Sequence, residues 1–365
     1  MRLLFANPHP YLPDSTSGRD ISIHEQVLRW RARGIDVAVF AARNGRDISI
    51  HAQALRWRAR GVEVAVFCER AGLSTAFERE DSLGYPVYRA AQPAAAFGAV
   101  LADWKPEIAI YPFGALSRPL LALGLQAGVK AALLVSNIEA SGLDASPLAR
   151  SDIALIANSQ FAARRIETLL GIRPPVVLPL IEPERYAVSS VAGDAVLLVN
   201  PSLRKGVELF FRLAEARPNI PFLAVESWPI SDAWRTVLMN RARSLNNVAL
   251  WPPVEDMREA YARARLVLMP SIYEETFGRV VAEAQLSGIP ALVSDRGALP
   301  ETLGGGGLAM PLDAGLDAWL QALDRLWLDP AFYAQCAAAA RAESTAEARD
   351  PERISERFLA ILRDF

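Results

Sequence analysis

The amino-acid sequence predicts an α/β protein built from two parallel sheets, each covered by helices on both faces. Short apolar runs alternate with helical patterns along all 365 residues, as strands and crossover helices do in such folds. A stretch rich in Pro, Ser and Gly, from about Val176 to Asp194, divides these runs into two groups. With 52% hydrophobic residues, the chain is long enough for two domains that each bury a core.

The predicted strands are short apolar runs in both halves of the chain. In the first half they are Leu3 to Ala6, Val37 to Phe40, Val64 to Phe67, Ile108 to Tyr111, Ala132 to Val135 and Ile153 to Ala157. In the second half they are Val196 to Val199, Phe222 to Val225, Val248 to Leu250, Leu266 to Met269 and Ala291 to Val293. Ligands of parallel sheets bind beyond the carboxyl ends of the strands, so we expect a cleft between the two halves.

An internal repeat occurs in the first half. Residues 18–44 recur as residues 45–71, with 20 of 27 positions identical. Each copy predicts one helix and one strand, and nothing else repeats at this period, which argues against a solenoid. The repeat is typical of a recent tandem duplication. We expect the extra unit to add a helix and a parallel strand to the first sheet by a right-handed crossover. Which copy holds the original position cannot be read from the sequence.

Composition excludes several classes of protein. The net charge of −2 gives no reason to expect a nucleic-acid partner. The chain has only two cysteines, Cys68 and Cys336, and they are far apart in the sequence, which is typical of proteins from a reducing compartment. Met1 to Asn7 lacks the apolar core of a signal peptide, and no apolar run reaches the ~18 residues that span a bilayer. We therefore expect a soluble, cytoplasmic protein.

The most informative segment runs from residue 270 to residue 301. An apolar strand ends at Pro270, a helix is predicted from about Phe277 to Ser287, and a second strand leads into a Gly-rich loop. Glycines and a helix N-terminus at the carboxyl end of a buried strand favour an anion. Glu275 and Glu283, eight positions apart, can accept hydrogen bonds from paired hydroxyls. A site that binds both phosphates and sugar hydroxyls is typical of a protein that binds a nucleotide sugar. The alternative is an ordinary α/β unit with two surface glutamates.

This segment resembles the donor-binding core of family 4 retaining glycosyltransferases (group 1), which have the GT-B fold of two Rossmann-like domains. Their pattern is P-S-x-x-E-x-F-G-x-x-x-x-E-A, and the residues in register with it are Glu275, Phe277, Gly278, Glu283 and Ala284. A Gly-x-x-Pro-Glu loop follows at Gly297 to Glu301. The resemblance implies that Glu275 holds the transferred sugar and Glu283 the ribose. It also implies that amides near Gly278, Arg279 and Val280 bind phosphate or sugar oxygens.

A second part of the resemblance lies after the first strand of the second half. Lys205 and Gly206 match a Lys-Gly pair that clamps the donor diphosphate in the family. Asn200 stands where the family has an Arg, and Arg204 is a neighbouring cation that can compensate. A cation here would oppose the charge that develops as the nucleotide leaves. Otherwise Lys205 is a solvated residue at a helix start, where the helix dipole disfavours a cation.

Candidates on the acceptor side are weaker. Gly18 opens a helix after the first strand, where related enzymes bring backbone N–H groups to donor phosphate and acceptor; simple capping of that helix is the alternative. No His lies between residues 105 and 145, where many family members carry one, so Asn137 and Glu139 are the polar groups that could take part of that role. His9 could act as an acceptor contact or base, or be a packed loop residue.

The resemblance implies an N-terminal acceptor-side domain of residues 1–185, a donor-binding domain of residues 186–348, and a C-terminal helix of residues 349–365 that packs on the first domain. We expect retaining transfer of a sugar from a UDP-, GDP- or ADP-sugar to a glycan, lipid or small-molecule hydroxyl, in polysaccharide, glycolipid or other glycoconjugate biosynthesis. No Asp-x-Asp triplet or Cys/His cluster occurs, so no metal or other cofactor is expected.

Two alternatives stay open. The basic motif LRWRARG, present twice with Trp30 and Trp57, could contact an anionic membrane surface peripherally, or be a solvated helix face. The protein could also be a catalytically impaired GT-B scaffold that binds sugar nucleotides or serves in assembly, because Asn200 and the missing His depart from the family pattern. A phosphorylase would need a cofactor-lysine context, and an epimerase more acid-base groups, than the sequence contains.

Overall fold

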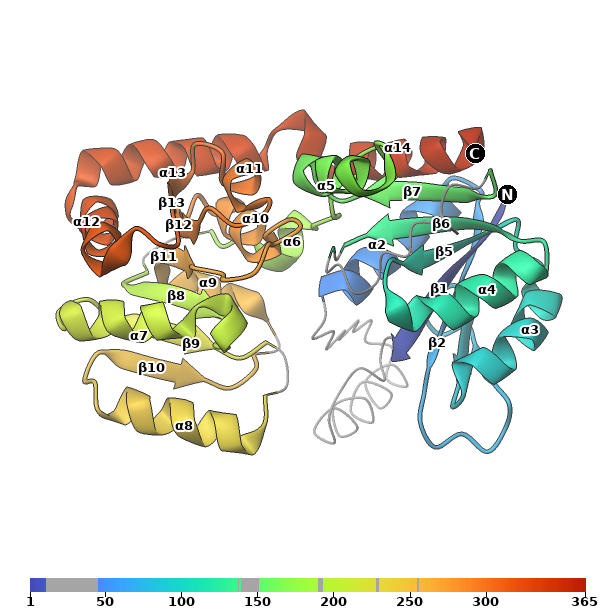
Figure 1. The fold of residues 1–365 in the computed structure, drawn as a ribbon, viewed down its shortest axis with the longest axis horizontal. Helices are drawn as coiled ribbons and strands as arrows, with labels where there is room; N and C mark the ends of the chain where they lie inside the picture. The colour runs from blue at the N-terminus through green and yellow to red at the C-terminus, as the bar shows by residue number, and fades with distance from the viewer. Residues whose placement is uncertain (11–44, 137, 139–150, 190–192, 228–229, 255) are drawn as a thin grey trace. The chain divides into compact units, whose positions relative to one another are not determined.

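The structure is a computed structural model that describes residues 1–10, 45–136, 138, 151–189, 193–227, 230–254 and 256–365. The chain divides into two compact units (Figure 1). The first contains Met1–Ile156, Ile166–Pro175 and Ser355–Phe365, and the second contains Ala157–Arg165 and Val176–Ile354. The chain therefore enters the second unit at residue 157, returns to the first at residue 166, and leaves it again at residue 176. The expected division, with boundaries after residues 185 and 348, contains fewer crossings between units than this path.

The first unit is built on a seven-stranded sheet of order β3-β4-β2-β1-β5-β6-β7. The recorded pairs are parallel except for β3, which is antiparallel to β4. Its strands are β1 (Arg2–Pro10), β2 (Glu63–Glu69), β3 (Glu78–Glu80), β4 (Val87–Ala90), β5 (Ile108–Pro112), β6 (Lys130–Val135) and β7 (Ile153–Ala157). Its helices are α2 (Gly45–Ala59), α3 (Pro93–Trp104), α4 (Arg118–Gln126), the last residues of α5 (Gln160–Leu170) and most of α14 (Pro351–Asp364).

Helices cover both faces of this sheet. On one face Phe5 of β1 stacks on Trp57 of α2, at 5.5 Å between ring centroids, and Trp57 meets the edge of Phe358 of α14 at 5.0 Å. On the other face, the rings of Phe97 in α3 and Tyr111 in β5 pack together at 6.3 Å. The C-terminal helix thus contributes directly to the core of the first unit, where burial of aromatic rings supplies much of the packing energy.

The second copy of the repeat provides α2 and β2, and β2 lies between β1 and β4. The position beside β1 is therefore held by residues 45–71. The first copy, with its predicted strand Val37 to Phe40, lies outside the described residues. Ala52 and Ala54 of the second copy are 7% and 0% exposed, where the first copy has Glu25 and Val27. The two copies are therefore not equivalent at the buried positions of this helix.

Burial of Trp57 bears on the alternative that the LRWRARG motif contacts a membrane. Trp57 is 0% exposed and donates a hydrogen bond from Nε1 to the backbone oxygen of Ser355 at 3.2 Å. Its ring is therefore not available to a membrane surface. Trp30 of the first copy lies outside the described residues.

The second unit is built on a six-stranded sheet of order β10-β9-β8-β11-β12-β13, in which all pairs are parallel. Its strands are β8 (Ala195–Val199), β9 (Phe222–Val225), β10 (Val248–Trp251), β11 (Ala264–Met269), β12 (Ala291–Ser294) and β13 (Gly307–Met310). Its helices are α6 (Pro183–Tyr186), α7 (Val207–Ala216), α8 (Asp232–Arg243), α9 (Met257–Arg263), α10 (Arg279–Gln285), α11 (Leu299–Leu303), α12 (Gly315–Leu328) and α13 (Pro330–Ser344).

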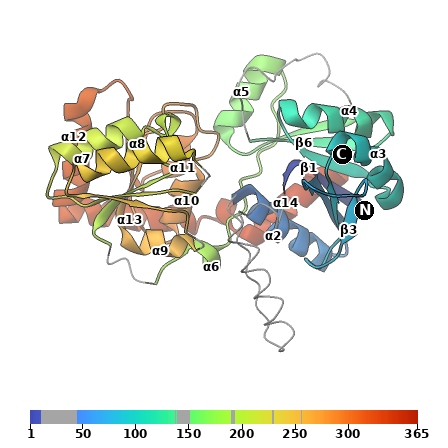
Figure 2. The same ribbon diagram turned by 90° about the horizontal axis from the view of Figure 1, so that it is seen from below.

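Two apolar clusters lie on opposite faces of this second sheet. Leu198 faces a cluster that includes α7, α8 and α12, and its neighbour Leu197 faces a cluster that includes α9 and α10. Figure 2 shows α7 and α8 on one side of the sheet and α9 on the other. Because successive side chains of a strand point to opposite faces, a strand buried on both faces must be apolar throughout, as predicted for these runs.

Candidate functional site

The predicted donor residues follow two strands that are neighbours in the second sheet. The strand order reverses between β8 and β11, because the chain moves outward from β8 to β9 and β10 and then returns to β11. The carboxyl ends of strands at such a switch point are where open α/β sheets bind ligands. Lys205 lies in a 3₁₀ turn (Leu203–Lys205) just beyond β8, and Glu275 lies in the loop beyond β11. The topology therefore places both residues at the same edge of the sheet.

A glycine brings the two loops into contact. Gly206 has φ of +76°, and a Cβ atom built there would lie 2.1 Å from the backbone oxygen of Pro270. Only a residue without a side chain permits this approach. Beside it, the backbone N–H of Ile272 donates to the backbone oxygen of Arg204 at 2.9 Å. The turn after β8 is thus tied to the loop after β11.

The structure brings Lys205 and Glu275 together. Lys205 Nζ lies 2.5 Å from Glu275 Oε1, and the two side chains are only 12% and 9% exposed. Ser271 Oγ donates to the same carboxylate oxygen at 2.7 Å, and the Tyr273 hydroxyl donates to Oε2 at 2.7 Å. Sequence reasoning missed Ser271 and Tyr273, although both stand within the same motif as Glu275. The carboxylate therefore has three donors and is held firmly in one orientation.

The main chain of Glu275 is fixed by a second glycine. Glu275 and Gly297 form an isolated parallel bridge, and the N–H of Ala298 donates to the Glu275 oxygen at 2.7 Å. Gly297 has φ of +68°, and a Cβ atom there would lie 2.1 Å from the Glu275 oxygen. The Gly-x-x-Pro-Glu loop is therefore a backbone support for Glu275.

Glu283 belongs to a separate network. It lies on α10, which begins after Gly278 and is shorter than the helix expected from Phe277 to Ser287. The Tyr261 hydroxyl donates to Glu283 Oε2 at 2.6 Å, and Arg279 Nε donates to Oε1 at 2.6 Å. Burial raises the pKa of the Glu283 carboxyl, while Arg279 and Tyr261 act in the opposite direction. Arg279, expected among the donor-binding residues, is thus the ion-pair partner of Glu283.

Arg204 adds a second cation to the site, and the Tyr273 ring lies close to both Arg204 and Lys205. The Arg204 guanidinium carbon lies 4.7 Å from the centroid of the Tyr273 ring, and Lys205 Nζ lies 5.1 Å from it. Cations over the face of an aromatic ring are attracted by its quadrupole. Both cations next to the buried Glu275 are therefore oriented by the same tyrosine.

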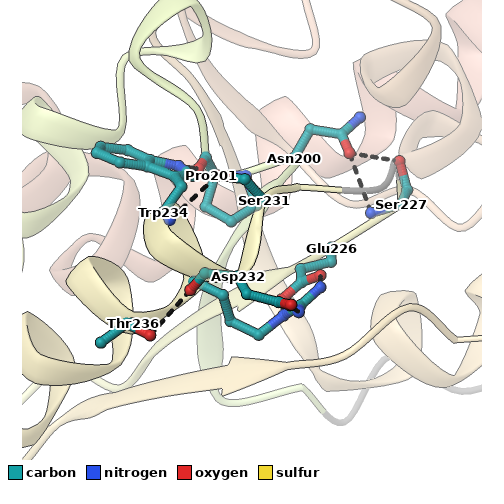
Figure 3. Close-up of polar contacts among 9 residues, drawn as sticks. Asn200, Pro201, Glu226, Ser227, Ser231, Asp232, Trp234 and Thr236 are labelled. Atoms are coloured by element: carbon teal, nitrogen blue, oxygen red, sulfur yellow. Dashed lines mark hydrogen bonds and ion pairs between the residues drawn. The ribbon is translucent and has the colours of Figure 1, made fainter.

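Asn200, which replaces the Arg of the family pattern, has a structural task. It has φ of +63°, a left-handed conformation that Asn tolerates better than most residues. Its Oδ1 accepts hydrogen bonds from the Ser227 N–H at 3.0 Å and the Ser227 hydroxyl at 2.8 Å (Figure 3). Asn200 thus links the carboxyl ends of β8 and β9.

The start of α8 closes the same edge of the sheet. Trp234 Nε1 donates to the Pro201 oxygen at 2.9 Å, and Ser231 caps the helix by accepting from the Trp234 N–H (Figure 3). Arg235 makes a bidentate pair with Glu226, with both distances 2.9 Å. Sequence reasoning missed both the pair and the cap. The partners of the ion pair are separated by a loop without a recognisable pattern, whereas Ser231 is a residue type that commonly caps helices.

Glu301, the last residue of the Gly-x-x-Pro-Glu loop, caps α5. Its two carboxylate oxygens accept from the N–H groups of Gln160 at 2.7 Å and Phe161 at 2.9 Å. Asn158 Nδ2, just before this helix, donates to Thr276 Oγ1 at 3.1 Å. These contacts join residues 157–165 to α11 and to the loop that carries Glu275, and they explain why this short segment belongs to the second unit.

Most of the predicted acceptor-side residues lie outside the part of the chain that the structure describes. Gly18, Asn137 and Glu139 lie outside the described residues. The backbone of His9 is part of β1, and its side chain is not among the described groups. In the described part of the chain, no group of three or more His, Cys, Asp or Glu side chains is placed to hold a metal ion. No described helix is long and apolar enough to cross a bilayer.

Part of the second unit is similar in sequence to a known family. Residues 201–329 match the model of the family described as glycosyl transferases group 1. The α-galactosylglucosyldiacylglycerol synthase of Streptococcus pneumoniae is 34% identical over 98 residues, which are 25% of this chain and 26% of that protein. The D-inositol 3-phosphate glycosyltransferase of Corynebacterium kroppenstedtii is 40% identical over 75 residues, 20% of this chain and 16% of that protein. The matches thus span about a quarter or less of these relatives.

Solved structures show the same fold over the whole chain. HepE from Anabaena in complex with UDP-glucose has a TM-score of 0.76 at 16% identity and covers 100% of both chains. A sucrose-phosphate synthase from Thermosynechococcus elongatus has a TM-score of 0.71 at 17% identity, covering 100% of this chain and 99% of that one. The predicted GT-B fold, with two parallel-sheet units, is therefore confirmed.

Proposed function

We propose that this chain, whose residues 201–329 match the group 1 glycosyltransferases, transfers a sugar from a nucleotide-sugar donor to an acceptor hydroxyl. One observation carries the proposal. Lys205 and Glu275, which the motif predicts to hold phosphate and sugar, lie 2.5 Å apart at the switch point of the second sheet. Two side chains 70 positions apart in the sequence thus meet at the edge where such sheets bind ligands.

The paired side chains suit a donor that carries both a diphosphate and hydroxyls. A carboxylate offers about four lone-pair sites, of which Lys205, Ser271 and Tyr273 use three at Glu275. A sugar hydroxyl can take the remaining site. The diphosphate has more charge than the carboxylate and attracts the Lys205 ammonium, which frees a second site for hydroxyls. Arg204 is near enough to add a second positive charge, and Glu283 is assigned to the ribose.

Transfer then needs only charge stabilisation and positioning from these residues. The bond between the anomeric carbon and the phosphate oxygen breaks, and the nucleoside diphosphate leaves with the bonding electrons. Lys205 stabilises the charge that develops on that oxygen. The acceptor oxygen forms the new bond from the same face, and its proton passes to the leaving phosphate, so the sugar keeps its configuration. Retention is part of the proposal and is supported by the Glu-x7-Glu motif.

The donor proposed for the first test is a UDP-sugar. The structural neighbour HepE was solved with UDP and with UDP-glucose, and the two relatives are named as enzymes of a glycolipid and of an inositol phosphate. We therefore propose hydroxyl acceptors of the glycan, lipid or polyol class. We also propose that cationic side chains serve in place of a divalent metal, so that treatment with EDTA leaves the rate unchanged. A rate lost with EDTA and restored by Mg²⁺ or Mn²⁺ would contradict this.

The experiment measures nucleotide release from UDP-glucose, GDP-mannose and ADP-glucose, with and without a panel of acceptors. The parent protein should release nucleotide from one donor, and Lys205→Ala should lower kcat/KM for that donor by about 100-fold, as loss of one transition-state donor does. Lys105→Gln is the matched control, since it removes an exposed cation of the first unit. Release that is unaffected by Lys205→Ala would show that the assigned site is wrong.

A second candidate is a sugar-nucleotide-binding scaffold without catalysis. Asn200 favours it, because its Oδ1 is engaged by Ser227 and it supplies no cation where the family has an Arg. The same donor panel separates the two candidates when binding is measured by thermal shift. Bound nucleotide at a hundredfold excess over Kd adds ~2.7 kcal/mol of stability. Binding of one nucleotide without turnover of any donor would favour the scaffold.

A further inference from the structure

The sheet of the first unit has a switch point of its own. The chain leaves β1, builds β2 and β4 on one side of it, and then returns to form β5 on the other side. Figure 1 shows β2 and β5 on either side of β1. Ligands of parallel sheets lie at the carboxyl ends of the strands at this point. Asn7 lies near the carboxyl end of β1. Its position in the first unit therefore corresponds to that of the loop carrying Lys205 in the second.

The side-chain oxygen of Asn7 is buried without a hydrogen-bond partner among the residues described. Asn7 as a whole is 2% exposed. Most buried polar side-chain atoms in proteins are hydrogen-bonded, and an unpaired one is destabilising. The folded protein therefore keeps a destabilising unpaired oxygen at the carboxyl ends of the strands, where such sheets bind ligands.

The backbone around Asn7 is irregular as well. Ala6 pairs with Phe67 and Pro10 with Glu69, so that four steps along β1 match only two along β2. Extra residues in a strand interrupt the ladder and redirect side chains, and they are frequent next to active sites. Asn7 lies within this interruption, where β1 departs from regular pairing with β2.

Other buried oxygens without partners have different surroundings. The Tyr111 hydroxyl of β5 packs against Gly124 of α4, where a Cβ atom would lie 2.2 Å away, on a helix-covered face of the sheet. Asn158 Oδ1 belongs to an amide whose nitrogen already donates to Thr276. In the described part of the first unit, Asn7 alone combines an unpaired buried oxygen with the carboxyl edge at the switch point.

We propose that Asn7 binds a hydroxyl group of the acceptor, with its Oδ1 accepting the hydrogen bond. This inference rests on the proposed function and adds a residue for its acceptor. The neutral carbonyl oxygen attracts an O–H donor and repels phosphate, so Oδ1 suits a hydroxyl of the polyhydroxylated acceptor better than the diphosphate of the donor. Asn7 is then an acceptor-binding residue that positions the attacking molecule.

The test measures polyol binding to the full chain without any donor. Dissociation constants of free glucose and myo-inositol are determined by ligand-observed NMR for the parent, Asn7→Leu and Tyr111→Phe. Asn7→Leu replaces the amide by an apolar group of similar size, and Tyr111→Phe removes an unpaired buried oxygen from the same sheet. We expect Asn7→Leu to raise Kd by about three- to tenfold, as loss of one neutral hydrogen bond does, and Tyr111→Phe to leave it unchanged.

Stability separates ligand binding from a structural role. Removal of a buried amide whose oxygen is unpaired should leave the urea midpoint of Asn7→Leu equal to or above that of the parent. A structural amide would instead lower the midpoint and leave Kd unchanged. Asn7→Ala provides the same reading if the leucine variant does not fold.

Equal Kd values for parent and Asn7→Leu, or no binding of either polyol by the parent, would overturn the inference and mean that Asn7 meets only water. If the proposed function is wrong, the protein will release nucleotide from none of the donors. That assay is independent of the binding of free polyols at Asn7, so the two failures can be told apart.

Discussion

Substitution of Gly297 by Ala tests whether the backbone of Glu275 must be held where it is. The added Cβ would lie 2.1 Å from the Glu275 oxygen and 2.6 Å from the Glu275 nitrogen. Carbon atoms approach such atoms to about 3.5 Å, so Glu275 or the loop must shift by about 1.4 Å. A displacement of about 1 Å at a reacting centre can lower a rate by about 100-fold. We therefore expect kcat of Gly297→Ala to fall by about two orders of magnitude.

The control separates this displacement from the cost of the left-handed backbone. Gly315 has φ of +79°, close to the +68° of Gly297, but a Cβ atom there meets nothing within 4 Å. Both variants should therefore lose about 1 to 2 kcal/mol of unfolding free energy, measured in urea, from the strain of a non-glycine residue. Gly297→Ala should lose more than this, because its Cβ also overlaps backbone atoms of Glu275. Only Gly297→Ala should also lose nucleotide release. Equal activity in the two variants would refute the role of the Glu275–Gly297 bridge.

Three further predictions concern stability. Deletion of residues 18–44 should keep the cooperative unfolding of the parent, because residues 45–71 hold the place in the sheet. Deletion of residues 45–71 should lower the unfolding free energy by about 3 kcal/mol or more, because Glu25 would enter a buried position now held by alanine. A lower urea midpoint for the first deletion would contradict this reasoning. Trp57→Ala should lower the unfolding free energy by about 3 to 5 kcal/mol, as large core truncations do; a loss below about 1 kcal/mol in urea would mean that the first copy can replace the second. Glu301→Ala should cost about 1 kcal/mol through the lost cap of α5, and an unchanged thermal midpoint would show that water serves equally well.

The main strands could be predicted because burial on both faces makes each one an apolar run. β4 and β13 escaped this reasoning for physical reasons. β4 (Val87–Ala90) contains Arg89, which is 1% exposed and is accommodated by an ion pair with Glu80 at 2.5 Å. β13 (Gly307–Met310) begins with a glycine after a run of glycines, a pattern typical of a loop.

The sequence pointed to some residues of the candidate site but not to their contacts. The spacing of the motif identified Lys205 and Glu275, yet their distance depends on the approach of Gly206 to Pro270, which no local pattern contains. Glu283 was expected to accept from a ribose, but its present partners include Tyr261, a residue 22 positions away on another helix. Contacts of this kind arise from tertiary packing, and a single sequence does not report them.

The repeated crossing of the chain between the two units limits how the protein can be divided. A fragment that starts near residue 186 would lack Gln160 and Phe161, whose N–H groups bond to Glu301. It would also lack Asn158, the partner of Thr276 beside Glu275. Hybrid enzymes made by joining this donor half to a foreign acceptor half at one breakpoint would inherit these unmatched groups. Recombination between homologues should therefore preserve residues 157–165 together with the half that follows them, as a discontinuous block.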